Sequence, residues 1–317
     1  MTTIAEPVSP RRSRSPRLRA RRLIRAVLVV AVTVLAAITL REQLPDPDTL
    51  LAALTAVDAR WVALALAAGL LSQVAFADQQ RRLLHGFGVR MPPAIAVALT
   101  LSRSAISMAL PAGSAVSAAY AFQIFRRHGA SKSVAVAVTL LSGLVSFVAL
   151  ALLYGFGWSV LLTSGLVLLL AAAVALSRRR ASGWSGPPVR WLADRLSPIR
   201  TAAQGVPATT WAGALLAGVA NWLLDMLCLL AAAQASHADV DITRLAVIYL
   251  GVQLVRQIPI TPGGIGLIET TMLAALIAAG APEAPAAAVV LVYRLVSFWI
   301  LLPLGAAGHL LLRSRRP

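Results

Sequence analysis

The sequence has few of the residues on which enzymes, metal sites and disulfide-bonded folds depend. Its 317 residues include one cysteine, Cys228, which cannot form a disulfide within the chain. The four histidines lack the short spacing of a zinc site, and they are His85, His128, His237 and His309. There is no Gly-rich nucleotide-binding loop and no nucleophile with a neighbouring base. We therefore expect a protein that is not an enzyme and that holds neither a cofactor nor a metal ion.

Charged residues are also scarce. They make up 13% of the chain, against about 25% in soluble proteins. Hydrophobic residues make up 58%, and 317 residues leave room for several membrane spans of about 20 residues each. The composition predicts an all-α integral membrane protein.

The charges that are present alternate in sign between the apolar runs. Of the 29 basic residues, 23 fall in five clusters, at 11–25, 81–90, 126–132, 178–200 and 313–316. The intervening connections carry acids, namely Glu42, Asp46, Asp48, Asp58, Asp239, Asp241 and Glu283. Cytoplasmic loops are enriched in Arg and Lys. The pattern predicts an inner or plasma membrane protein with both termini in the cytoplasm, and basic clusters that meet anionic headgroups, not nucleic acid.

The apolar runs predict about six full spans within a membrane domain at 23–312. The spans are expected near 23–40, 61–77, 133–156, 158–176, 210–233 and 284–304. A basic tail at 1–22 is expected to be disordered, and 177–209 to be a cytoplasmic loop. The spacing of leucines in 46–60 predicts a short interfacial helix on the outer side.

Two further apolar runs are each broken by proline and glycine. The first break is at Pro111 and Gly113 between basic flanks, and the second is at Pro262-Gly263-Gly264 between acidic flanks. Opposite flanks and matched spacing predict inverted-topology repeats, at about 61–156 and 210–304, with broken helices meeting near the midplane. The arms are slightly too short to cross the membrane, which favours re-entrant pairs over two full spans. A break at that depth must be buried in protein or line a polar cavity.

Five charged residues lie within apolar runs, where each is costly unless paired or functional. They are Arg103, Asp225, Arg256, Glu269 and Arg294. One interpretation is a set of ion pairs, Glu269 with Arg294 and Asp225 with Arg256. The other is an anion site, because arginine suits phosphate and helix N-termini add positive charge. Glycines at 263, 264 and 266 would let the backbone approach a headgroup closely.

The second break carries a resemblance to a known family. The stretch from Gln257 to Glu269, with Asn221-Trp-Leu-Leu-Asp225 before it and Tyr293-Arg294 after it, resembles the transmembrane region of lysylphosphatidylglycerol synthases, also called flippase-like membrane proteins. In the first half, Leu110–Gly113 and Arg126–Gly129 are similar to the family's motif. The resemblance implies a helical bundle that moves a lipid or lipid-linked glycan between leaflets. No synthase activity is expected, because the chain ends at Pro317 without an aminoacyl-transferase domain.

Two functions are consistent with these features. The first is a flippase-like transporter of an anionic phospholipid or polyprenyl-linked glycan, with Asp225 and Glu269 as ion-pair or proton-coupling residues. Its expected substrate-binding residues are Arg103, Pro111, Gly113, Arg256, Pro262, Gly263, Gly264, Gly266, Glu269 and Arg294. The alternative is a non-transporting partner that positions a separate lipid- or glycan-modifying enzyme. Where the family often has Gly-Glu after its first Pro-Gly, this chain has Ala115-Val116.

Overall fold

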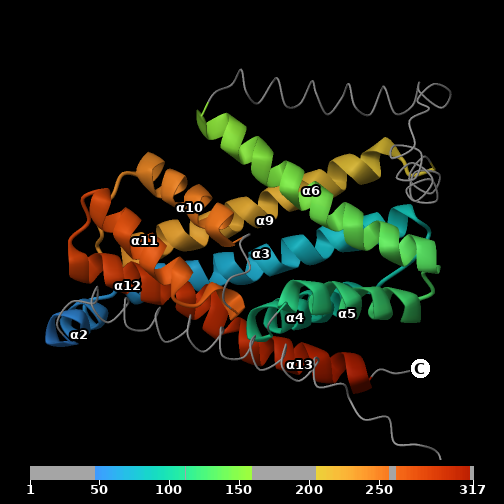
Figure 1. Cartoon of the computed structure of the whole chain (residues 1–317), viewed down its shortest axis with the longest axis horizontal. Helices are drawn as coiled ribbons and strands as arrows, with labels where there is room; N and C mark the ends of the chain where they lie inside the picture. The colour runs from blue at the N-terminus through green and yellow to red at the C-terminus, as the bar shows by residue number, and fades with distance from the viewer. Residues whose placement is uncertain (1–46, 111, 159–204, 257–261, 315–317) are drawn as a thin grey trace, which may run out of the picture.

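The computed structural model describes residues 47–110, 112–158, 205–256 and 262–314, and within these ranges every regular element is a helix (Figure 1). A short first helix, α2 (Pro47–Thr55), lies where the interfacial helix is predicted. The predicted spans near 23–40 and 158–176, the tail at 1–22 and most of the 177–209 loop lie outside the described residues.

In the described ranges, four helices are long and apolar enough to cross a membrane, and each coincides with a predicted span. Three of them are α3 (Ala59–Gly86), α6 (Lys132–Trp158) and α9 (Ala208–Ala235). The fourth is the continuous helix Glu283–Ser314, which consists of α12 (Glu283–Arg294), a π-helical turn η2 (Leu295–Trp299) and α13 (Leu301–Ser314).

Shorter helices come in two pairs, each interrupted where proline and glycine interrupt the sequence. The first pair is α4 (Pro93–Ala109) and α5 (Gly113–Arg127). The second is α10 (Ile242–Arg256) and α11 (Leu267–Ala278), with the 3₁₀ turn η1 (Pro262–Gly264) between them. The two helices of each pair pack together, and the pairs enter from opposite ends of the molecule (Figure 1).

An antiparallel pair, α3 with α9, forms the centre of the bundle. At one end the Asp58 N–H donates to Ala235 O at 2.9 Å, and at the other end Gly86 packs against Thr210. The facing surfaces carry small buried residues such as Ala65, which let the two helix axes approach closely. In this central pair, α3 packs on α4 of the first broken pair and α9 packs on α10 of the second.

A second close crossing joins α4 to α13. Gly305 packs on Ala105 and on the backbone of Leu101, and Gly308 packs on Ala98 O. The Ser102 hydroxyl donates to Ala98 O at 2.7 Å and lies 3.2 Å from Gly305 O. The last helix is thus held tightly against the first broken pair.

Charges separate between the two ends of the bundle. Of the described residues, seven basic ones lie at the end where α3 finishes, namely Arg81, Arg82, Arg90, Arg126, Arg127, Lys132 and Arg313. The opposite end carries five acids, Asp48, Asp58, Asp239, Asp241 and Glu283, together with Arg60 and Arg244. There the N–H groups of Thr243 and Arg244 donate to Asp241 Oδ1 and hold the pKa of this carboxyl below its ordinary value. The three-dimensional arrangement therefore gathers the predicted cytoplasmic connections at one end.

Candidate functional site

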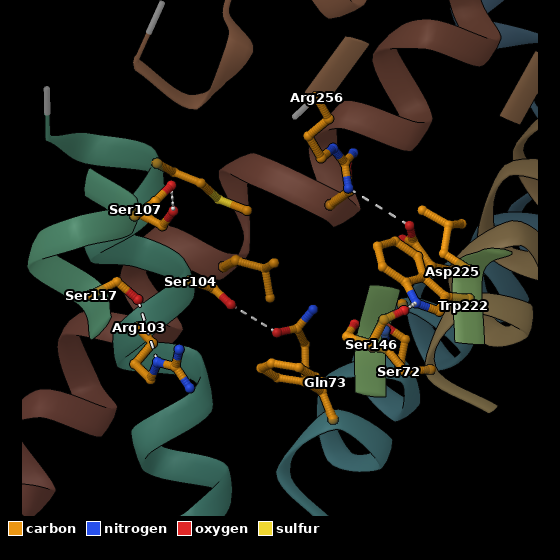
Figure 2. Close-up of a pocket in the computed structure, with 18 of the residues that line it drawn as sticks. Ser72, Gln73, Arg103, Ser104, Ser107, Ser117, Ser146, Trp222, Asp225 and Arg256 are labelled. Atoms are coloured by element: carbon orange, nitrogen blue, oxygen red, sulfur yellow. Dashed lines mark hydrogen bonds and ion pairs between the residues drawn. The ribbon is translucent and has the colours of Figure 1, made fainter. Parts of the chain in front are cut away.

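A cavity of about 450 Å³ lies inside the bundle, between the first broken pair and the α3–α9 pair (Figure 2). Its walls come from α3, α4, α5, α6, α9, the end of α10 and the last helix. Polar side chains line it despite the apolar helices, and they are Ser72, Gln73, Arg103, Ser104, Ser107, Ser114, Ser117, Ser146, Asn221, Asp225, Arg256 and Ser297. The described lining residues include two arginines and one aspartate, which gives a formal charge of +1 (+2 − 1).

Arg103, on α4, supplies the unbalanced charge. Its Nη1 donates to Gln80 Oε1 at 2.6 Å, its Nε lies 3.4 Å from Ser117 Oγ, and its guanidinium lies 5.8 Å from the centre of the Phe76 ring. Among the described residues, no carboxylate lies within 4.0 Å of it. Neutral partners therefore hold this guanidinium at the cavity wall with its charge available to an anion.

Asp225, on α9, lies across the cavity from Arg103 (Figure 2). Its Oδ2 accepts hydrogen bonds from Tyr249 (3.0 Å), Gln253 (2.9 Å) and Tyr293 (3.2 Å). Arg256 Nη1 lies 3.7 Å from the same oxygen, and Arg256 Nη2 donates to Tyr293 at 3.2 Å. Three neutral side chains therefore donate to Oδ2 besides the long ion pair, so this oxygen keeps hydrogen-bond donors if Arg256 moves.

Glu269 and Arg294 lie at the second break and are absent from the cavity lining. Arg294 Nε lies 2.5 Å from Glu269 Oε1, and Arg294 Nη2 donates to Gly263 O at 3.3 Å. Glu269 Oε2 accepts the Gly266 N–H at 2.8 Å, at the start of α11, and the Arg294 guanidinium lies 4.4 Å from the centre of the Phe298 ring. This pair therefore fixes the chain at the break and joins it to the last helix.

Glycine is required at the second break for conformational reasons. Gly263, Gly264 and Gly266 have φ of 62°, 68° and 83°, in the left-handed region that disfavours a Cβ. A Cβ on Gly263 would also meet the Phe298 ring and Met108 O. The carbonyl of Met108 belongs to the end of α4, so the two breaks lie against each other, as the sequence predicts.

The structure divides the predicted site residues into two groups. Arg103 and Arg256 line the cavity with Asp225, whereas Glu269, Arg294 and the three glycines build the second break. Gly113 begins α5 so close to the carbonyls of Ile106 and Ser107 that a side chain there would clash. Pro111 and the Pro262 side chain lie outside the described residues. The predicted ion pairs are both present, Glu269 with Arg294 and Asp225 with Arg256.

Sequence reasoning missed the serines. Seven of them line the cavity, and they come from five different parts of the fold. On α4 and α5 they recur at a spacing of three, Ser104 with Ser107 and Ser114 with Ser117, which places each pair on one helix face. The spacing of these serines could therefore have predicted a polar face on each of the two helices.

Residues 22–305 match the family model described as the lysylphosphatidylglycerol synthase TM region. The chain belongs to this family. With four long apolar helices in the described ranges, membership makes it a multi-pass membrane protein.

Two curated relatives are also similar, both named UPF0104 membrane protein and both from Methanothermobacter thermautotrophicus. One is 29% identical over 87 residues and the other 31% identical over 86 residues. Each alignment covers 27% of this chain and 26% of the relative. The chain therefore matches about a quarter of the length of these relatives, and their names give no substrate.

Proposed function

We propose that this protein is a flippase-like transporter that moves a lipid with an anionic headgroup between membrane leaflets. The observation that carries the proposal is the polar cavity inside an apolar bundle, with Arg103 facing it and having no carboxylate partner among the described residues. A charge at such a position is costly, and without an ion partner it indicates a functional site. The anion it suits is a phosphate, which arginine binds in a planar, bidentate way.

Access from the surrounding lipid also supports transport. Phe147 lines the cavity and has 64% of its surface exposed, so the cavity reaches the surface of the bundle beside α6. A headgroup enters there while its acyl chains remain in the lipid. The anionic candidates are a phospholipid and a polyprenyl-linked glycan.

Arg256 takes the second role in the mechanism. Its Nη1 lies 3.7 Å from Asp225 Oδ2, and 30% of its side chain is exposed. An arriving phosphate competes with Asp225 for this guanidinium, and the hydrogen bonds from Tyr249, Gln253 and Tyr293 remain on Oδ2 of the carboxylate. Because Arg256 ends α10 just before the second break, its movement would couple headgroup binding to that break.

The proposal includes an orientation and an architecture. The two broken pairs form re-entrant elements of inverted-topology repeats, and the basic end of the bundle faces the cytoplasm, with both termini there. The opposite entry of the two pairs and the separation of charge between the ends support this arrangement (Figure 1). We place the protein in an inner or plasma membrane and expect no catalytic activity of its own.

The alternative is a non-transporting partner of a lipid- or glycan-modifying enzyme. The Glu269–Arg294 pair, which is almost fully buried, is what a purely structural core would contain. The cavity and Arg103 favour transport over this alternative, and the two functions differ in one measurable property.

That property is leaflet-resolved movement of a fluorescent phosphatidylglycerol in reconstituted vesicles. We expect wild type to exceed empty vesicles clearly, and Arg103→Gln to be at least about tenfold slower, since a hydrogen bond to a charged group contributes roughly 1.5–3 kcal/mol. Arg60→Gln is the matched control, because Arg60 is an exposed arginine at the start of α3. If wild type moves lipid no faster than empty vesicles, the transport proposal is wrong and the alternative stands.

A further inference from the structure

We propose that the cavity selects headgroups in which a singly charged phosphodiester carries a hydroxyl-rich group, a glycerol or a sugar, and that it rejects headgroups bearing ammonium groups. The inference rests on the proposed function and specifies its substrate. Three observations support it: the charge of the cavity, the hydroxyl groups on its walls, and the hydrogen bonds that its one described carboxylate already accepts.

Charge is the first argument. The described lining residues carry a formal charge of +1, so a monoanionic phosphodiester makes the occupied cavity neutral. A lysyl ester of phosphatidylglycerol carries one phosphate and two ammonium groups, and its net charge of +1 would bring the total to +2. Like charges brought together in a desolvated site oppose binding.

The single carboxylate is the second argument. An ammonium group in a low-dielectric site requires an acidic partner or several acceptors. Asp225 is the one carboxylate among the described lining residues, and its Oδ2 already accepts from Tyr249, Gln253 and Tyr293 beside Arg256. Besides Asp225, whose Oδ2 is occupied in this way, the described walls offer no carboxylate to an ammonium group.

Hydroxyl groups are the third argument. Serines reach the cavity from α3, α4, α5, α6 and η2, so that hydrogen-bonding groups surround it on several sides (Figure 2). Ser297 Oγ is buried, at 8% residue exposure, and has no hydrogen-bond partner among the described residues. A serine hydroxyl both donates and accepts, as the hydroxyls of glycerol and sugars do, and a buried one without a partner is costly.

Size agrees with this chemistry. A volume of about 450 Å³ falls within the range of small-molecule sites, roughly 300–1,000 Å³, and a phosphate group alone would leave much of it empty. A polyol attached to the phosphate fills the remaining space and meets the serines.

The test compares three fluorescent lipids with the same acyl chains in vesicles containing the full chain. We expect phosphatidylglycerol to move fastest, phosphatidic acid more slowly because it lacks the polyol, and lysylphosphatidylglycerol at least about tenfold more slowly than phosphatidylglycerol. Glycerophosphoglycerol, a soluble phosphodiester with one negative charge, is trapped in the vesicle lumen as a fourth probe. Its retention identifies the lipid headgroup as the source of the ligand, whereas its release without lipid movement keeps the polyol phosphate as ligand but contradicts the flippase.

A variant tests the charge argument directly. Ser117→Asp places a carboxylate beside Arg103 Nε, whose present distance from Ser117 Oγ is 3.4 Å, and lowers the formal cavity charge to zero. We expect the ratio of phosphatidylglycerol to lysylphosphatidylglycerol movement to fall by about tenfold or more. Ser117→Asn is the matched control, because it has the same size without the charge and should keep the wild-type order of the two lipids.

The outcomes separate the two proposals. If no lipid and no glycerophosphoglycerol moves, the proposed function fails. If wild type moves lysylphosphatidylglycerol as fast as phosphatidylglycerol, transport stands and the selectivity proposed here is overturned. The selectivity is also overturned if Ser117→Asp and Ser117→Asn show the same ratio of phosphatidylglycerol to lysylphosphatidylglycerol movement. Thermal unfolding in detergent must first show that both variants are folded.

Discussion

Three arginines lie inside the bundle, and each has different surroundings. Arg294 is 4% exposed and held by Glu269 and the Gly263 carbonyl. Arg256 is partly exposed and has a long ion pair with Asp225, while Arg103 has only neutral partners among the described residues. We therefore assign Arg294 to the architecture of the second break, and the other two to the cavity.

Loss of the Glu269 charge should destabilise the protein strongly. Glu269→Gln leaves the buried Arg294 guanidinium unpaired, and breaking a buried pair in this way costs about 3–5 kcal/mol. Thermal unfolding in detergent, followed by intrinsic fluorescence, should show a lower Tm.

The control for that prediction is Arg81→Ala. Arg81 pairs with Asp78 at 2.7 Å, but 40% of the Arg81 side chain is exposed, and an exposed pair contributes about 0–1 kcal/mol. In the variant, Asp78 also keeps its ion pair with Arg82, whose Nε lies 2.5 Å from Asp78 Oδ2. Equal Tm shifts for Glu269→Gln and Arg81→Ala would contradict the structural role assigned to Glu269.

For single residues, the sequence predicted which charges lie in the apolar core but not whether each forms an ion pair or binds an anion. An arginine within an apolar run is conspicuous, so all five charged residues could be identified. Which of them pair depends on the distances between helices, and the sequence left ion pairing and anion binding as alternatives. Serines are inconspicuous in membrane helices, and Ser72, Ser146 and Ser297 meet only through tertiary packing.

Among the elements, the four predicted spans that fall within the described residues were correct in place and too short in length. The span predicted at 61–77 continues as α3 to Gly86, and the span predicted at 284–304 continues to Ser314. The predicted spans ended where basic residues follow the apolar run, because such residues mark the edge of the membrane. The helices themselves continue beyond that edge. In α3, Arg81 and Arg82 bond to Asp78 one turn earlier, which stabilises the extension.

The crossing of α4 with α13 depends on glycine. A leucine at Gly308 would meet Ala98 O and Ser102 Oγ, forcing α13 away from α4. We expect Gly308→Leu to lower the free energy of unfolding by about 1–3 kcal/mol, measured from thermal or denaturant unfolding in detergent.

Gly251→Leu is the matched control for this crossing. Gly251 lies in α10, and a Cβ there meets no atom within 4 Å. Leucine is also the better helix former, by up to about 1 kcal/mol. A loss of stability as large as that of Gly308→Leu would show that the close crossing is not what matters.

At the scale of the whole molecule, the separation of charges predicts which connections share a side of the membrane. Ser131, between α5 and α6, lies at the basic end, and Asp239, between α9 and α10, lies at the acidic end; both are exposed. With the buried Cys228 replaced by alanine, a cysteine at Asp239 should react with a membrane-impermeant maleimide in intact cells. A cysteine at Ser131 should react only after the cells are opened. Labelling of both from the same side would contradict the inverted-repeat arrangement.

The unpaired charge of Arg103 also has an electrical consequence for the transport cycle. Moving one elementary charge through 100 mV changes its free energy by about 2.3 kcal/mol. The described walls of the empty cavity carry +1, and the same walls around a monoanionic headgroup carry no net charge. In the proposed cycle, therefore, a membrane voltage acts on the empty protein and not on the loaded one, and it sets the leaflet toward which the empty cavity opens.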